Sequence, residues 1–161
     1  MTSRILGFGI LALLGCQAGP SKSNAEGEIQ VTVVVVLATD QSQTIGPRLE
    51  CLAKEIQKTE PALTGFRLAK SVCQKVEIGK KVEFPLVEDE VASIVVKHGC
   101  DKDDRVGLTV KAPLVGEIAY SCACGKFFPI MTRYQTKDKE RLIIAIRVQP
   151  CPCKKKEGKK Q

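Results

Sequence analysis

The chain has 161 residues, the length of a single domain, and 43% of them are hydrophobic, which is typical of a globular rather than a disordered protein. Aromatic residues make up only 4%, so a core must consist mainly of Val, Ile and Leu. The formal net charge is +7, but residues 28–153 carry 18 basic against 16 acidic side chains. A basic face is therefore not indicated, and we expect no nucleic-acid partner.

The first segment has the anatomy of a secretory leader. Residues 1–4 are short and contain one positive side chain, residues 5–14 form an apolar run, and Gly15 precedes Cys16. The run has about ten residues, whereas a membrane-spanning helix needs about 20. We therefore expect a signal peptide over residues 1–15 and no permanent spanning helix.

Residues Leu13, Leu14, Gly15 and Cys16 resemble the lipobox of bacterial lipoproteins. The resemblance implies that the sulfur of Cys16 carries a diacylglyceryl group and that Cys16 becomes the N-terminus after cleavage. Leu14 departs from the family pattern, in which a smaller or β-branched residue is more common. The resemblance covers only the first tenth of the chain, and it predicts a location rather than an activity.

The location implied is extracytoplasmic, with Cys16 bound to membrane lipid of a bacterial envelope. Gln17 rather than Asp follows the cysteine, which in a Gram-negative envelope implies the outer membrane. Two alternatives remain open: cleavage after Ala18, which gives a soluble secreted protein, and an uncleaved buried helix. With the lipobox prediction, residues 16–27 are the lipidated cysteine and a flexible polar tether.

The folded part is expected over residues 28–153. Residues 28–38 are rich in Val and predict a long strand buried on both faces. A helix is predicted to begin at Pro47 and to end near Thr59, because Pro is favoured in a first helical turn and Pro61 disfavours a helical residue before it. Its apolar stripe has helical spacing: Leu49, Leu52, Ala53 and Ile56.

Seven further strands are predicted after residue 64, each separated from the next by turn residues. They cover residues 65–72, 80–87, 90–97, 105–112, 115–122, 126–134 and 140–148. Runs of this length and spacing predict a mainly β fold with one helix, as an antiparallel β-sandwich or a partly open barrel. The helix is expected to cover one face or to close one end.

Candidates for catalysis are weak. His98 is the only histidine, and its place before a Gly-Cys turn favours a structural role over that of a base. Residues 101–104 resemble the opening of a calcium loop, but the sixth position is Val106 and the twelfth is Ala112, so a solvated turn is expected. Residues 88–90 are three consecutive acids typical of a polar turn. Phe127 and the nearby aromatic residues 120, 128 and 134 are expected to take part in core and cross-strand packing rather than to stack on bases.

The eight cysteines are more informative, because acylation of Cys16 leaves an odd number. Two C-x-C units are present, Cys122-Ala123-Cys124 and Cys151-Pro152-Cys153. We expect a non-catalytic binding or scaffolding module of the cell envelope, with no cofactor and an unidentified protein partner. The first alternative is a protein that binds zinc or copper through these four thiolates. The second is a thiol redox enzyme.

The two C-x-C units are predicted to lie side by side. The last two strands form a hairpin that turns at residues 136–138, and pairing Gln135 with Lys139 gives opposite residues a position sum of 274. Continued to the open end, this register places Cys122 and Cys124 opposite residues 150–152. The expected outcome is a disulfide link across the hairpin mouth, with a four-thiolate metal site as the alternative.

The C-terminal segment, residues 154–161, is predicted to be a basic disordered tail. Five lysines from Lys154 to Lys160 accompany one acid, Glu157. The sharper alternative to a merely solvated tail is weak attraction to an anionic surface of the envelope, such as acidic lipid.

Overall fold

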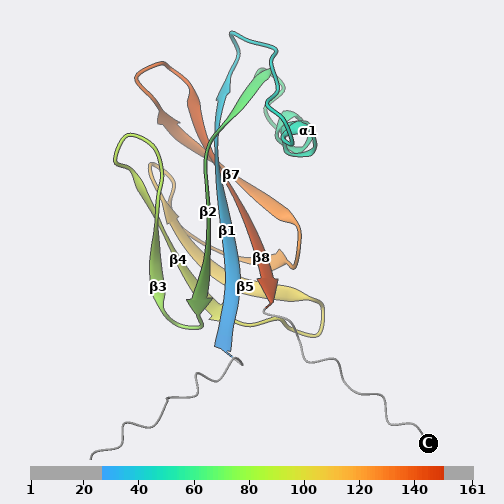
Figure 1. Ribbon diagram of the computed structural model, residues 1–161, viewed down its shortest axis with the longest axis vertical. Helices are drawn as coiled ribbons and strands as arrows, with labels where there is room; N and C mark the ends of the chain where they lie inside the picture. Colours follow the sequence, from blue (N-terminus) through green and yellow to red (C-terminus); the bar gives the residue numbers. More distant parts are fainter. Residues whose placement is uncertain (1–26, 151–161) are drawn as a thin grey trace, which may run out of the picture.

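The computed structural model describes residues 27–150, which form two antiparallel four-stranded sheets packed face to face with one helix outside them (Figure 1). The first sheet has the order β2-β1-β8-β7 and the second β3-β4-β5-β6. The strands are β1 (Glu28–Thr39), β2 (Gly65–Glu77), β3 (Lys81–Pro85), β4 (Val91–His98), β5 (Arg105–Ala112), β6 (Gly116–Ala123), β7 (Phe127–Gln135) and β8 (Arg141–Pro150). The helix α1 is Glu50–Gln57.

The predicted mainly β fold with one helix is confirmed, and the architecture is a sandwich. Within residues 27–150 no strand pairing joins the two sheets, so they are not closed into a barrel. Each of the eight predicted strands is present. The chain changes sheet twice, between β2 and β3 and between β6 and β7.

Strand β1 is central because it supplies side chains to two cores. Its odd-numbered residues, among them Val31, Val33 and Val35, are completely buried between the two sheets. Its even-numbered residues Val34 and Val36 face outward under α1. A strand covered on both faces has no solvated side, which is why its sequence is a run of Val rather than an alternation of apolar and polar residues.

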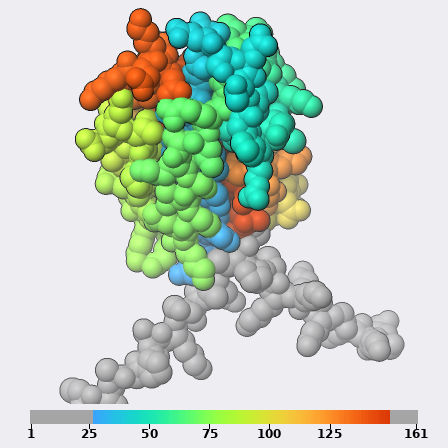
Figure 2. All heavy atoms as spheres, turned by 45° about the horizontal axis from the view of Figure 1, so that its top comes forward, coloured from blue at the N-terminus to red at the C-terminus, as the bar shows by residue number. Residues whose placement is uncertain are grey.

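The second core lies between α1 and the outer face of the first sheet. Ala53 and Ile56 of the helix are 1% exposed and pack against residues of β1 and β8, including Ile143 and Ala145. Figure 2 shows α1 on the outside of the molecule, as expected for a helix that covers one sheet face. Since α1 has only eight residues, it covers only part of that face.

The predicted start of the helix at Pro47 is wrong by three residues. Pro47 lies in a turn whose next residue, Arg48, has φ of +68°, a left-handed conformation that interrupts a helix. The turn is closed by the amide of Leu49, which donates to the carbonyl of Gly46 at 3.1 Å. The helix therefore begins at Glu50, while its end at Gln57 agrees with the predicted stop.

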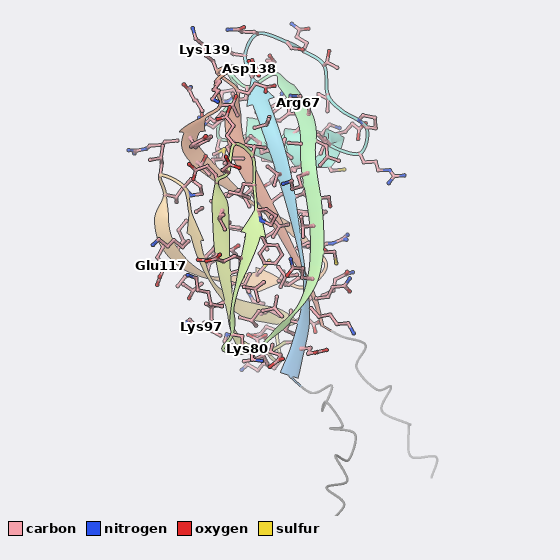
Figure 3. All side chains as sticks on the ribbon, turned by 60° about the vertical axis from the view of Figure 1, so that its left-hand side comes forward. Arg67, Lys80, Lys97, Glu117, Asp138 and Lys139 are labelled. Carbon is pink, nitrogen blue, oxygen red and sulfur yellow. The ribbon has the colours of Figure 1, made fainter. Side chains whose placement is uncertain are left out.

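The first and last strands meet at one end of the sandwich, because Ile29 of β1 pairs with Pro150 of β8. We call this end the tether end, after the tether expected over residues 16–27 (Figure 1). It also carries the β2–β3 and β4–β5 turns and the β6–β7 connection. Lys80 and Lys97 lie there, whereas Arg67, Asp138 and Lys139 lie at the opposite end (Figure 3). No helix within residues 27–150 combines the length and apolarity needed to span a bilayer.

Candidate functional site

The predicted site residues divide between described and undescribed parts of the chain. Cys16, Cys151 and Cys153 lie outside residues 27–150, as do the tail lysines Lys154–Lys160, so the lipidation site and half of the predicted thiolate set are not placed. Cys122 and Cys124 are placed, at the end of β6 and directly after it. The juxtaposition of the two C-x-C units therefore stays a prediction.

The hairpin register is confirmed over its open half. Phe127 pairs with Arg147 and Met131 pairs with Ile143, each with the predicted position sum of 274. The anchoring pair is wrong, because Gln135 pairs with Arg141 instead of Lys139. A register shift between residues 131 and 135 absorbs the difference of two. The tip is accordingly shifted by one residue along the chain and is closed by hydrogen bonds between residues 136 and 140.

The prolongation of that ladder to the first C-x-C unit is also wrong. Cys122 lies on β6, which pairs with β5 in the second sheet, so it does not extend β7. The chain crosses to the first sheet at Gly125, whose φ is +79°, and the amide of this residue donates to the carbonyl of Val148 at 2.8 Å. Cys122 is 2% exposed and packs in the core between the sheets, where burial raises the pKa of its thiol.

Cys124 instead lies beside Cys100, a residue for which no partner was predicted from the sequence. Their sulfur atoms are 3.4 Å apart, across the β4–β5 turn and the β6–β7 connection. Loss of solvent around Cys100, together with the neighbouring thiol and the Asp104 carboxylate 3.7 Å away, raises the pKa of Cys100 to about 12. The protonated form of this thiol is therefore favoured while both cysteines are reduced.

Cys73 is the cysteine with the opposite tendency. It is exposed on the edge strand β2, and its sulfur accepts hydrogen bonds from Thr32 Oγ1 at 3.5 Å and Gln30 Nε2 at 2.9 Å. These two bonds, aided by the charge of Arg147, lower the pKa of the Cys73 thiol. The exchange chemistry of a dithiol redox enzyme requires a second sulfur beside the first. Within the described chain no second sulfur contacts that of Cys73.

A concave groove of about 1100 Å³ lies between α1 and the uncovered part of the outer face of the first sheet. Its volume is slightly above the range of about 300–1,000 Å³ typical of ligand pockets. Apolar side chains dominate the lining and come from α1, β1, β2 and β7: Val34, Leu52, Leu68, Phe127, Pro129 and Met131. Leu68 and Phe127 are 51% and 40% exposed, so Phe127 is not a core residue. The expected cross-strand packing is present, because Phe127 pairs with Arg147 of β8.

Basic side chains are gathered in the same groove. Arg147 lies over the ring of Phe127, with its guanidinium carbon 4.8 Å from the ring centroid. The Nε atom of Arg147 is buried and has no hydrogen-bond partner among the described residues. Arg48 and Lys126 also line the groove, and the one acid there, Glu55, is paired with Lys58 at 2.5 Å. The groove thus combines an apolar floor with an excess of positive charge.

The other candidates from the sequence are structural. His98 ends β4, is exposed, and lies over Gly107, where an added Cβ would come within 2.3 Å of the imidazole. Asp101 closes the β4–β5 turn by accepting from the amides of Asp103 and Arg105, each at 2.9 Å, which confirms the solvated turn. In residues 27–150 no three side chains from His, Cys, Asp and Glu come together as a metal site would require.

No family model, no curated protein and no solved structure matches this chain.

Proposed function

We propose that this protein is a membrane-tethered, extracytoplasmic lipoprotein whose β-sandwich is a non-catalytic binding module of the cell envelope. The ligand we propose for it is an anionic amphiphile, one acyl chain ending in a carboxylate, held in the groove between α1 and the first sheet. The observation that carries the proposal is the unpartnered, buried Nε of Arg147 in an otherwise apolar groove.

Charge and shape both favour this ligand. An unpaired buried donor is costly, and a carboxylate would supply the acceptor that Arg147 lacks. A guanidinium presents parallel N–H groups that match the two oxygens of a carboxylate. The apolar side chains of Leu52, Leu68 and Met131 could then cover the acyl chain, which favours an amphiphile over a small hydrophilic anion.

The tether provides the context. A domain held by Cys16 at a membrane surface would meet acyl-chain ligands at high local concentration. The leader, the lipobox-like residues and the polar segment before β1 all support that location.

Calorimetric titration of laurate into the full chain carrying Cys16→Ser tests the proposal, since this variant can be purified without detergent and the chain has no tryptophan for fluorescence. We expect binding of laurate and at least tenfold weaker binding of dodecanol, because hydrogen bonds to a charged group contribute about 1.5–3 kcal/mol. Arg147→Met should weaken laurate binding similarly. Arg133→Met on the exposed side of β7 is the control and should change nothing. Equal binding of laurate by both variants would exclude Arg147 as the recognition group.

A further inference from the structure

We propose that Cys100 and Cys124 form an intrachain disulfide that joins the β4–β5 turn to the β6–β7 connection at the tether end. The proposal is independent of the ligand in the groove. It rests on the proposed extracytoplasmic location only for the supply of oxidant.

The backbone already brings the two residues together from opposite sides of one strand. β5 pairs with β4 on one edge and with β6 on the other, so the segments that carry Cys100 and Cys124 flank the beginning of β5. The amide of Cys124 donates to the carbonyl of Asp104 at 2.9 Å, and the amide of Asp101 donates to the carbonyl of Arg105 at the same distance. The two segments are thus fixed to adjacent residues, Asp104 and Arg105, at the beginning of β5.

The sulfur atoms need only a small displacement. They are 3.4 Å apart, and a disulfide bond is about 2.05 Å long. Side-chain rotations that bring the two sulfur atoms closer by little more than an ångström therefore close the gap. Cys100 is half-buried and has no strong alternative partner: the contact of its sulfur with Asp104 is longer, at 3.7 Å.

Among the cysteines at residues 27–150, no other pair has its sulfur atoms in contact. Cys122 is buried in the core, and its thiol points to the carbonyl of Ala123 at 3.8 Å. Cys51 on α1 and Cys73 on β2 are exposed on other parts of the molecule. Cys100 is therefore the nearest placed partner for Cys124, although Cys122 lies only two residues away in the sequence.

The reaction is a two-electron oxidation by an external disulfide, such as oxidised glutathione or a protein thiol oxidase. One thiolate attacks a sulfur of that disulfide and expels its first thiol; the second cysteine then attacks the mixed disulfide and expels the other. Two S–H bonds are lost and one S–S bond is formed, while the oxidant takes up two electrons and two protons as two thiols.

The link would close a loop that contains all of β5 and β6. In the chain-entropy account, closing a loop of this length stabilises the folded state. Reduction of the bond removes that stabilisation and lowers the midpoint of thermal unfolding by on the order of 10 °C. It would also tie the β4–β5 turn, through Gly125, to the end of β8, since the amide of this glycine donates to Val148.

Peptide mapping of the full-length protein tests the pairing. After denaturation, alkylation of free thiols and tryptic digestion without reductant, Cys100 is in the peptide 98–102 and Cys124 is in the peptide 112–126. We expect these two peptides to be joined and to separate on reduction. Fragmentation in the mass spectrometer should locate the alkyl label on Cys122. The joined peptide should persist in Cys122→Ala and disappear in Cys124→Ser. Reductant should lower the thermal midpoint of the wild type but not of Cys124→Ser.

Two preparations separate the pairing from the location. Reduced protein treated with oxidised glutathione reports whether the pair forms at all, and protein isolated from the native envelope reports whether an oxidant reaches it. Alkylation of both Cys100 and Cys124 in each preparation would overturn the proposal, as would retention of zinc by these thiols. A link formed only with oxidised glutathione supports the pairing and contradicts the extracytoplasmic location.

Discussion

Glu88 is a surface carboxylate that joins the two sheets at the end opposite the tether. It lies in the β3–β4 turn with φ of +51°, and its two oxygens accept from the amide of Lys137 at 2.9 Å and the hydroxyl of Tyr134 at 2.7 Å. These bonds favour the ionised form and lower the pKa of Glu88, while the bond to the carboxylate raises the pKa of Tyr134 to about 12. The predicted polar turn therefore also fastens the β7–β8 hairpin.

The contribution of Glu88 to stability should depend on pH. Because its folded pKa is below the ordinary value of 4.5, the contribution is complete above that pH and is lost as pH falls through the lower folded value. We expect Glu88→Gln to lower the thermal midpoint at pH 7 and to lower it less at pH 3. The neighbouring Glu90→Gln is the control. An equal loss at both pH values would show that the charge is irrelevant.

Single residues also mark the limit of inference from sequence. The spacing of Cys122 and Cys124 predicts that both sulfurs point the same way, but it carries no information on a partner in a turn 24 residues away. The contact with Cys100 arises because β5 passes between the two segments. Such a contact follows from the order of strands in a sheet, which local patterns do not encode.

At the scale of elements, the helix α1 shows what its short length implies. An isolated helix of eight residues is not stable in water, so its formation depends on the second core. Ile56 is 1% exposed there, packed with residues of β1 and β8.

We therefore expect Ile56→Ala to reduce the free energy of unfolding by about 2–4 kcal/mol, through lost burial and the cavity left behind. Glu55→Ala, at an exposed position of the same helix, should change it by less than about 0.5 kcal/mol. Urea unfolding of both variants measures the difference. A small effect of Ile56→Ala would mean that α1 contributes little to the fold.

Most strands could be predicted because their patterns are local. β5 agrees with its prediction at both ends, and the Val-rich pattern of β1 correctly indicated burial on both faces. The assignment of individual strands to the two sheets could not be predicted in the same way. At Gly125 the chain turns away from β6 into another sheet, whereas the sequence alone is equally compatible with one long ladder. The groove beside α1 depends on which strands form the first sheet, so it could not be predicted from the sequence either.

At the scale of the whole molecule, the proposed anchor predicts a separation of folding from location. Cys16→Ser removes the proposed acylation site but none of the residues that build the two cores. We expect the variant to keep the thermal midpoint of the wild type, to lose fatty-acid labelling, and to leave the membrane fraction. Labelled fatty-acid incorporation with fractionation measures this, and Cys51→Ser is the matched control. Unchanged labelling would refute the lipoprotein assignment.

The pairing of β1 with β8 at the tether end determines how the domain responds to mechanical force. A pull on both ends of the chain acts where Ile29 meets Pro150, so it opens the antiparallel ladder one rung at a time, in an unzipping geometry, instead of shearing all rungs together. Unzipping requires less force. A pull between Cys16, the proposed anchor, and a ligand held in the groove instead runs along β1, where the rungs to β2 and β8 share the load. The sandwich should therefore unfold at a higher force under this pull than when its own two ends are pulled apart.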